Sequence, residues 1–340
     1  MGVLWESQSL WVNIIFGLVA LAILILSSDE AVKRLIGLAD YFNLSTTFMG
    51  MTVVSLATSI PEISSHLTAS VGILTHQLDY KIGSAIVLGA NIGSDVVQQT
   101  LILGFVVFSA GTLYFRRYFL WKSMIPMIGT TIMCIIFGWD RTYSRLDGFI
   151  FFATFVLYTY FLYWDERKYY RKEPEPEEDK KVPQTRAEAI KYAIIALIAM
   201  GLTILSAQIV LHITEIVVHK TGIGGSLIGV ITLGVASALP ELMTAISGIK
   251  NKEHGISLGT LVGSNITNPL VAIGGGALVS TYWVPQPLIY WDLPWETITG
   301  IILWLILWFR KGKLSKVGAL YLMALYFIYV GLRAVFFAVD

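Results

Sequence analysis

The sequence has little of what many functional sites use. It has 340 residues, of which one is a cysteine, Cys134, and only 14% are charged. A single cysteine inside an apolar run excludes a disulfide framework and a thiolate metal site. The formal net charge of +1 provides no basic surface for a nucleic-acid partner. Such sparse charge also leaves too little polar surface for a soluble domain of this size.

Long apolar runs occupy most of the chain. Hydrophobic residues make up 55% of it, and the mean hydropathy is +0.69. An apolar stretch of about 20 residues spans a hydrocarbon layer ~30 Å thick as a helix. Tyr and Trp lie at the ends of several stretches, for example Tyr163 and Trp164, as in an interfacial aromatic belt. We therefore expect an integral membrane protein surrounded by a lipid bilayer.

The apolar pattern predicts an all-α membrane protein of ten transmembrane helices. A polar segment rich in charge and proline, 165–187, predicts a mobile linker outside the bilayer. It separates a first half, 1–164, from a second half, 188–340, with five spans in each. The expected helices are 8–28, 44–74, 82–110, 120–138, 146–168, 188–218, 223–249, 255–280, 294–310 and 315–337.

The placement of basic residues predicts the orientation. If the N-terminus lies outside, 19 of the 24 Lys and Arg residues fall on the cytoplasmic side. This asymmetry follows the positive-inside rule. We expect a multi-pass protein of the cell membrane with both termini outside and 165–187 in the cytoplasm.

Two motifs occur once in each half. Residues 52–62 read TVVSLATSIPE and 231–241 read ITLGVASALPE, while 88–98 read LGANIGSDVVQ and 258–268 read LGTLVGSNITN. With five spans per half, the second copy enters the membrane from the opposite side. An inverted repeat of this kind is typical of secondary transporters, whose site lies near the midplane. The first half has nine more residues between its motifs, which predicts a longer outer connection near 71–82.

The first motif combines a helix break with a carboxylate. Pro61 and Pro240 each remove a backbone donor, so the helix breaks at the centre of the membrane. The carbonyls freed by the break must line a cavity or bind a cation. Glu62 and Glu241 follow directly, and an intramembrane carboxylate is costly. Two such residues at equivalent positions argue against a structural accident.

The surrounding residues supply further oxygen ligands. The second motif consists of small and glycine-rich residues, so its helix can pack closely against the interrupted helix. Four residues beyond Ser94 and Ser264, one turn along the same face, lie the amides Gln98 and Asn268. Carbonyls, hydroxyls, amides and two carboxylates form a hard-oxygen site for sodium, calcium or magnesium. The hydroxyl residues beside the breaks are Ser55, Thr58, Ser59 and Ser237.

These residues resemble the calcium/cation antiporter superfamily, in particular its sodium/calcium exchanger branch. ATSIPE and ASALPE are similar to the first motif of the family's repeats, and GSDVVQ and GSNITN are similar to the second. The resemblance covers the ten-span plan with a central cytoplasmic loop. It implies antiport of Ca2+, or a similar divalent cation, against Na+ by alternating access. It implies no cofactor besides the transported ions.

The resemblance also implies individual roles. Glu62 and Glu241 would be central ligands of calcium, alternating with sodium, together with the backbone carbonyls of Thr58 and Ser237. The Ser55 and Gly234 carbonyls would serve sodium, and Gln98 and Asn268 would be central amide ligands. The hydroxyls expected to serve sodium are those of Thr58, Ser59, Ser237, Ser94 and Ser264.

Several positions depart from the family pattern. Gln98 is one methylene longer than the usual Asn, and Ala238 replaces a hydroxyl residue. Asp95 replaces an Asn and faces either the cavity or a neighbouring helix. His66 lies one turn beyond Glu62, where a satisfied histidine is favoured over a metal ligand or proton relay. The acidic run 173–179 is interpreted as solvated linker rather than a regulatory calcium site.

Two other transport functions stay open at this point. In a proton-coupled exchanger of the same fold, Glu62 and Glu241 would exchange protons for the divalent ion. In a cation channel they would form a selectivity site. An enzyme is not expected, because no nucleophile–base pair or HExxH motif is present. We expect a monomer that binds small inorganic cations, and spans 1 and 6 that slide against a core of the other eight.

Overall fold

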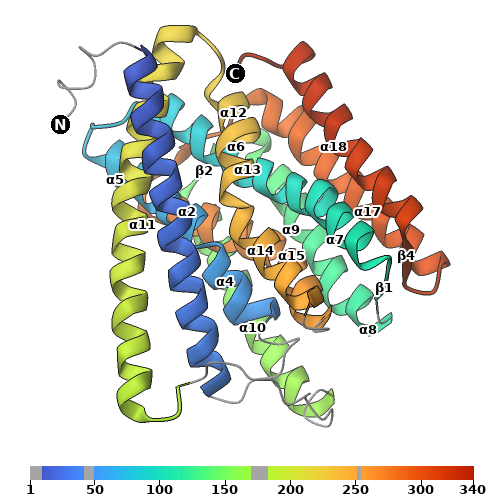
Figure 1. The fold of residues 1–340 in the computed structure, drawn as a ribbon. Helices are drawn as coiled ribbons and strands as arrows, with labels where there is room; N and C mark the ends of the chain where they lie inside the picture. The colour runs from blue at the N-terminus through green and yellow to red at the C-terminus, as the bar shows by residue number, and fades with distance from the viewer. Residues whose placement is uncertain (1–9, 42–49, 116, 170–182, 251–253) are drawn as a thin grey trace.

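The structure is a computed structural model that describes residues 10–41, 50–115, 117–169, 183–250 and 254–340. Helices dominate these residues, and the strands form two short pairs (Figure 1). Seven helical stretches are long and apolar enough to cross a bilayer, which confirms the expected class of multi-pass helical membrane protein. These stretches are Tyr80–Ala110, Arg117–Asp140, Arg145–Trp164, Arg186–Thr221, Gly225–Ile246, Leu288–Phe309 and Lys316–Phe336.

Two long helices stand side by side at one edge of the molecule. They are α2, Leu10–Tyr41, and α11, Arg186–Thr221 (Figure 1). At 1.5 Å per residue, their 32 and 36 residues extend about 48 and 54 Å, further than a hydrocarbon layer of ~30 Å requires. Both therefore project beyond the bilayer.

The first helix ends later than its sequence predicts. The expected end at residue 28 is wrong, because the helix continues through the charged residues to Tyr41. Arg34 Nε donates to Glu30 Oε1 one turn earlier at 2.7 Å, a spacing that stabilises helix in water. The Arg34 guanidinium also lies 4.7 Å from the centre of the Tyr192 ring on α11. Contacts with α11 thus extend the helix beyond the apolar stretch.

The first motif of each half lies on an interrupted helix. In the first half η1, Gly50–Val54, leads into α4, Ser55–Thr58, and then α5, Ile60–Leu74. The interruption falls at Ser59 in one half and at Ala238 in the other, where ψ is 7° and −1°. This confirms the expected breaks beside Pro61 and Pro240. The second-half elements are α12, Gly225–Ile228; η5, Gly229–Leu233; α13, Gly234–Ser237; and α14, Leu239–Lys250.

The second motif of each half lies on a helix with a π-helical segment after it. Such segments are frequent at functional sites, and here they begin at Gln98 and at Asn268. In the first half 75–79 connect α5 to α6, whereas the corresponding connection of the second half, 251–253, lies outside the described residues. The elements are α6, Tyr80–Val97; η2, Gln98–Ile102; α7, Leu103–Ala110; α15, His254–Thr267; η6, Asn268–Ile273; and α16, Gly274–Val279.

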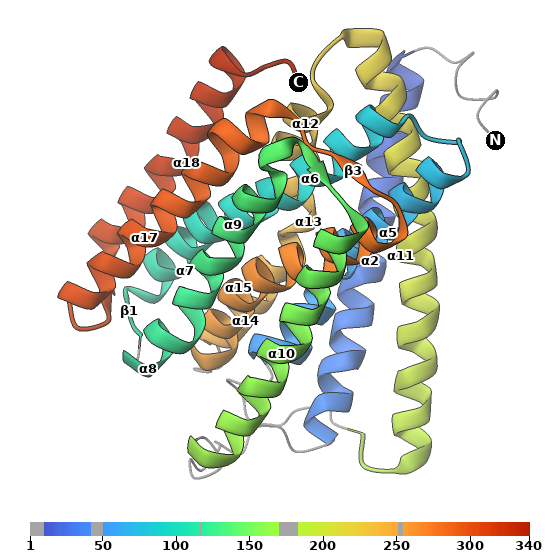
Figure 2. The same cartoon turned by 180° about the vertical axis from the view of Figure 1, so that it is seen from behind.

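The remaining helices cover the opposite side of the core (Figure 2). Helix α10 continues to Tyr169, so the first residues of the expected linker 165–187 are helical, and its acidic run 173–179 lies outside the described residues. The elements are α8, Arg117–Phe119; η3, Leu120–Met124; α9, Ile125–Phe137; η4, Gly138–Asp140; α10, Arg145–Tyr169; η7, Leu288–Asp292; α17, Leu293–Phe309; and α18, Lys316–Phe336.

Two antiparallel strand pairs join the halves. Strand β1, Thr112–Tyr114, pairs with β4, Lys313–Ser315, so that Leu113 lies opposite Leu314. Strand β2, Thr142–Tyr143, pairs with β3, Tyr282–Trp283. Each pair takes one strand from each half of the chain, so both pairs fix how the halves pack together.

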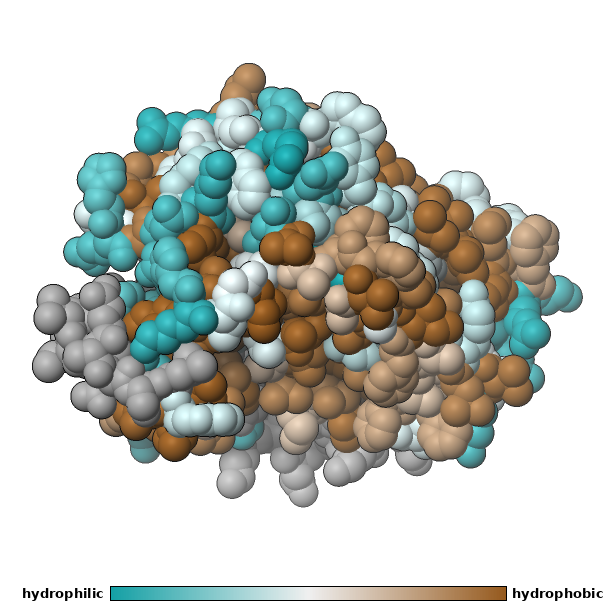
Figure 3. All heavy atoms as spheres, turned by 90° about the horizontal axis from the view of Figure 1, so that it is seen from above, coloured by the Kyte–Doolittle hydropathy of each residue, from teal (hydrophilic) through white to brown (hydrophobic). Residues whose placement is uncertain are grey.

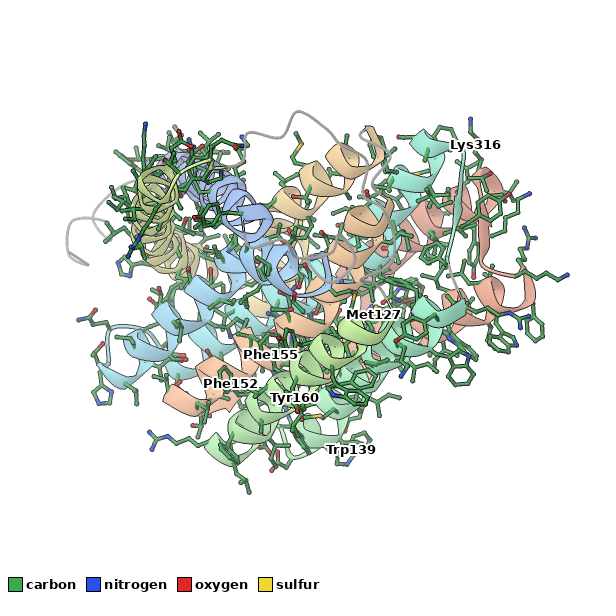
Figure 4. The ribbon with its side chains drawn as sticks, turned by 90° about the horizontal axis from the view of Figure 1, so that it is seen from below. Met127, Trp139, Phe152, Phe155, Tyr160 and Lys316 are labelled. Atoms are coloured by element: carbon green, nitrogen blue, oxygen red, sulfur yellow. The ribbon has the colours of Figure 1, made fainter. Side chains whose placement is uncertain are left out.

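The surface is apolar over wide areas. Phe309 is 79% exposed and Leu157 is 69% exposed, and Figure 3 shows hydrophobic residues spread over the face seen from above with hydrophilic ones gathered in patches. Phe152 and Tyr160, both exposed, lie along α10 in Figure 4. Monomeric soluble proteins do not expose contiguous apolar surface on this scale. Lipid is the solvent that this surface requires.

Candidate cation site

The two glutamates lie inside the core at the helix interruptions. Glu62 in the first turn of α5 is 3% exposed, and Glu241 in the first turn of α14 is fully buried. Each accepts a hydrogen bond from the serine of the second motif in its own half. Ser94 Oγ donates to Glu62 Oε1 at 2.8 Å, and Ser264 Oγ donates to Glu241 Oε1 at 3.3 Å. The motifs therefore meet as the sequence predicts.

Each glutamate also lies near a hydroxyl residue of the opposite half. The Ser237 side chain lies beside Glu62, and the Thr58 side chain lies beside Glu241. Thr58 Oγ1 lies 3.3 Å from Ser264 Oγ, which joins the two sets of contacts. Each carboxylate thus accepts a hydrogen bond from a hydroxyl of its own half and lies beside a hydroxyl of the other half. The two glutamates share a single polar cluster.

Several oxygens of this cluster have no protein partner. They are the second carboxylate oxygens of Glu62 and Glu241, the hydroxyl of Ser59, and Oδ1 of Asn268. A buried oxygen without a partner pays the full cost of losing water. All are hard oxygen ligands, the kind that sodium and calcium prefer. Where they face one another, a bound cation would offset that cost.

The predicted amides occupy the cluster differently. Both ends of Gln98 are engaged, because its Nε2 donates to Ser94 Oγ at 3.0 Å and its Oε1 accepts from Asn265 Nδ2 at 3.2 Å. Asn268 Nδ2 donates to Asp95 Oδ1 at 2.6 Å, which leaves its own oxygen free. Asp95 therefore contacts η6 at the residue expected to be a central amide ligand. Sequence reasoning overlooked Asn265, although its position repeats that of Asp95.

The backbone carbonyls expected to serve sodium already accept hydrogen bonds. The Ser55 carbonyl accepts from Ser59 N at 3.0 Å and from Thr58 Oγ1 at 3.2 Å. The Gly234 carbonyl accepts from Ala238 N and from Ser237 Oγ, both at 3.3 Å. A carbonyl oxygen has two lone pairs, and both are used here, so an ion would have to replace a hydroxyl donor.

Glycines let each second-motif helix pack on the interrupted helix of the other half. A Cβ on Gly93 would lie 2.6 Å from Val230 Cα, and a Cβ on Gly263 would lie 2.8 Å from Ser55 Cβ. Gly93 is on α6 and Val230 is on η5, whereas Gly263 is on α15 and Ser55 is on α4. Each half therefore packs its second-motif helix against the first-motif helix of the other half. This packing brings Ser237 beside Glu62 and Thr58 beside Glu241.

A narrow crevice reaches the cluster from the side of α2 and α11. Its volume is 20 Å³, enough for about one water molecule, and its walls include Leu24 of α2, Val210 of α11 and Glu62. His66 also lines it. His66 Nδ1 lies 3.1 Å from the Tyr282 hydroxyl, whereas Nε2 has no partner. The hydrogen bond with Tyr282 favours a positioned histidine over a metal ligand.

Soft-metal chemistry finds no support in this region. Over the ranges that the structure describes, three or more His, Cys, Asp or Glu side chains nowhere gather closely enough to hold a metal ion. Cys134 is buried within the core, where its sequence context placed it. A cation at this site would depend on two carboxylates supplemented by hydroxyls and amides.

Comparison with known families agrees with this geometry. A family model described as "Sodium/calcium exchanger protein" matches residues 12–164 and 191–335. The chain is 26% identical over 312 residues to the inner membrane protein YrbG of Escherichia coli, covering 89% of this chain and 91% of that protein. It is 23% identical over 325 residues to the sodium/calcium exchanger MaX1 of Methanosarcina acetivorans, covering 86% and 90%.

Solved structures show a related fold. The sodium-calcium exchanger NCX_Mj, soaked with Na+ and Ca2+, superimposes with a TM-score of 0.63 at 21% identity, over 94% of this chain and 98% of NCX_Mj. The same exchanger soaked with Na+ and Sr2+ gives 0.63 at 23% identity, over 95% and 99%. The two chains share an architecture along nearly their whole length.

Proposed function

The chain belongs to the sodium/calcium exchanger protein family, and on that premise we propose that it exchanges Ca2+, or a similar divalent cation, for Na+ at a site between Glu62 and Glu241. Two carboxylates supply a charge of −2. That charge balances one divalent ion or two monovalent ions, but not both sets together. Competition for the same charge would couple the two fluxes.

The observation that carries this proposal is the shared cluster around the glutamates. Each carboxylate has one oxygen held by a serine and one oxygen without a partner. The free oxygens are available to an ion, while the hydroxyl donors hold both side chains in place. The residues proposed to complete the site are Thr58, Ser59, Ser237, Ser94, Ser264 and Asn268. Gln98 would lie behind them as an amide bonded to Ser94. The Ser55 and Gly234 carbonyls would each lose the hydroxyl donor that they now accept from and bind an ion in its place.

We assign ten spans in two inverted five-helix repeats. The seven apolar stretches are supplemented by Trp11–Ser27 on α2, by η1 to α5, and by α15 to α16. The reciprocal contacts of Gly93 and Gly263 support the inversion, since each half presents its second motif to the first motif of the other. The halves are 1–164 and 188–340, joined by 165–187. One chain holds the whole cluster, so a monomer suffices.

Access to the site would alternate through motion of α2 and α11. These helices pack against each other at one edge and form one wall of the crevice that reaches Glu62 (Figure 1). Sliding this pair would close the crevice on one side of the membrane and open one on the other. The positive-inside rule places both termini outside and residues 165–187 in the cytoplasm.

Transport in vesicles tests the proposal. Purified protein is reconstituted with sodium inside, and calcium uptake is followed after dilution into sodium-free medium, with and without a proton ionophore. Uptake that requires the outward sodium gradient and resists the ionophore is expected. Uptake that follows only a pH gradient would assign proton coupling instead, and conductive calcium flux without a counter-ion would assign a channel.

A further inference from the structure

A second pair of carboxylates lies behind the central cluster. Asp95 on α6 and Glu296 on α17 are each 2% exposed and line the same small cleft, with Thr131 of α9. Two further acids in the membrane core are costly unless something neutralises them.

Asp292, one turn before Glu296, is a buried acid whose charge is neutralised by a basic side chain. Asp292 is fully buried, and Arg333 Nε lies 3.0 Å from its Oδ2. No Lys or Arg belongs to the walls that the described residues form around Asp95 and Glu296. Thr131 Oγ1 donates to Glu296 Oε1 at 2.8 Å, and Asn268 Nδ2 donates to Asp95 Oδ1 at 2.6 Å. Both partners are neutral, so the charge stays unbalanced.

Asn91 provides an independent sign of a ligand. Its side chain is fully buried and lines both this cleft and the crevice that reaches Glu62. Asn91 Nδ2 donates to the carbonyl of Asn268 at 3.4 Å, which fixes the orientation of the amide. Asn91 Oδ1 has no partner. This buried amide oxygen lies beside two carboxylates and has no positive neighbour. A ligand of a cation would have the same surroundings before the ion binds.

We propose that Asp95, Glu296 and Asn91 bind one sodium ion at a second site beside the central one, with one of the two carboxyls protonated so that the charge balances. The ligands are all oxygen, which selects a hard cation. The cleft has no room for a water molecule, so the ion would be dehydrated. Mg2+ keeps several waters, and Ca2+ takes six to eight oxygens, so neither suits this cleft.

Asn268 connects this second site to the central one. Its Nδ2 donates to Asp95, and its Oδ1, which has no partner, is a ligand of the proposed central site. A sodium ion on Asp95 would compete for that hydrogen bond and change how Asn268 presents its oxygen. This consequence rests on the proposed central site, whereas sodium binding at Asp95 and Glu296 does not.

The test measures sodium binding where the central site has been removed. The full chain carrying Glu62→Gln and Glu241→Gln is titrated in detergent with NaCl against choline chloride at constant ionic strength, and the midpoint of thermal unfolding is followed. We expect the midpoint still to rise with sodium. Adding Glu296→Gln should lower the apparent sodium affinity at least tenfold, whereas Glu188→Gln, an exposed charge-matched control, should leave it unchanged.

Two results would overturn the second site. One is a double variant whose midpoint no longer responds to sodium, which means that protons alone neutralise the two carboxyls. The other is a response that Glu296→Gln leaves intact. If Glu296→Gln does not fold, Asn91→Leu in the same background must give the same loss. Failure of the central site would show itself separately, as calcium transport that survives Glu62→Gln and Glu241→Gln.

Discussion

The two halves of the molecule build the same contacts from partly different residues. Glu62 with Ser94 repeats as Glu241 with Ser264. The contact between Asp95 and Asn268 repeats as the contact between Asn265 and Gln98, with the partners exchanged between halves. Positions that match in both halves hold the carboxylates. Positions that differ decide which oxygens remain free for a ligand.

The difference between the halves is an excess of acid on one side. The first half has Asp95 where the second has Asn265. Aligning Pro126 with Pro294 puts Ile128 opposite Glu296. The symmetric part of the core therefore holds the two central carboxylates, and the asymmetric part adds two further acids where the other half has Asn265 and Ile128.

The largest effect should come from the residues that the halves share. Glu62→Gln and Glu241→Gln each remove one charge from a buried cluster, which costs at least ~3 kcal/mol and lowers calcium uptake more than about 100-fold. Initial uptake rates in sodium-loaded vesicles measure this, with Glu188→Gln as the exposed control. If one glutamate tolerates the change and the other does not, the two halves do not contribute equally to the site.

The glycines should show equal dependence on close packing in both halves. Gly93→Ala and Gly263→Ala place a Cβ within 3 Å of the opposite helix, so each should destabilise the fold by about 1–3 kcal/mol. Thermal unfolding in detergent measures this. Gly201→Ala in α11 meets nothing within 4 Å and should be neutral or stabilising. A neutral Gly93→Ala would mean that α6 and η5 separate easily.

The sequence predicts the repeated features better than the differences between them. Pro61 and Pro240 locate the helix breaks, and the hydroxyl and carboxylate residues of the motifs do come together. That each second motif packs on the other half was not predictable, because a glycine pattern indicates close approach without naming the partner helix. The end of α2 was also missed, since the Arg34 contact with Tyr192 joins residues far apart in the sequence.

The roles of Asp95 and Glu296 show the same limit. Asp95 departs from the family pattern, but the sequence does not indicate the direction of its side chain. Glu296 lies outside both motifs, in the apolar stretch 294–310, and no local pattern relates it to Asp95. Only the packing of α17 against α9 and α6 brings the two carboxylates into one cleft.

Asn268 and Gln98 should differ in their effect on calcium affinity, because the Asn268 side-chain oxygen has no partner and both ends of the Gln98 amide are hydrogen-bonded. Asn268→Leu removes an unpartnered oxygen from the central cluster and should weaken apparent calcium affinity about tenfold, or ~1.4 kcal/mol. Gln98→Leu removes an amide whose two ends already bond to Ser94 and Asn265, so its effect on affinity should be smaller, about threefold. Calcium dependence of uptake measures both. The reverse ranking would mean that Gln98 turns toward the ion when one is bound.

The smallest expected effect comes from making the halves more alike. Ser59 has a buried hydroxyl without a partner, whereas its counterpart in the second half, Ala238, has no hydroxyl at all. Ala238→Ser would add a second such hydroxyl and should raise apparent sodium affinity about twofold, or ~0.4 kcal/mol, because part of the gain is lost in burying a polar group. Ser59→Ala should lower sodium affinity by a similar factor. Sodium inhibition of calcium uptake measures both changes. If Ala238→Ser lowers sodium affinity while Ser59→Ala has no effect, the ion does not approach these positions, and the asymmetry at Ala238 reflects packing alone.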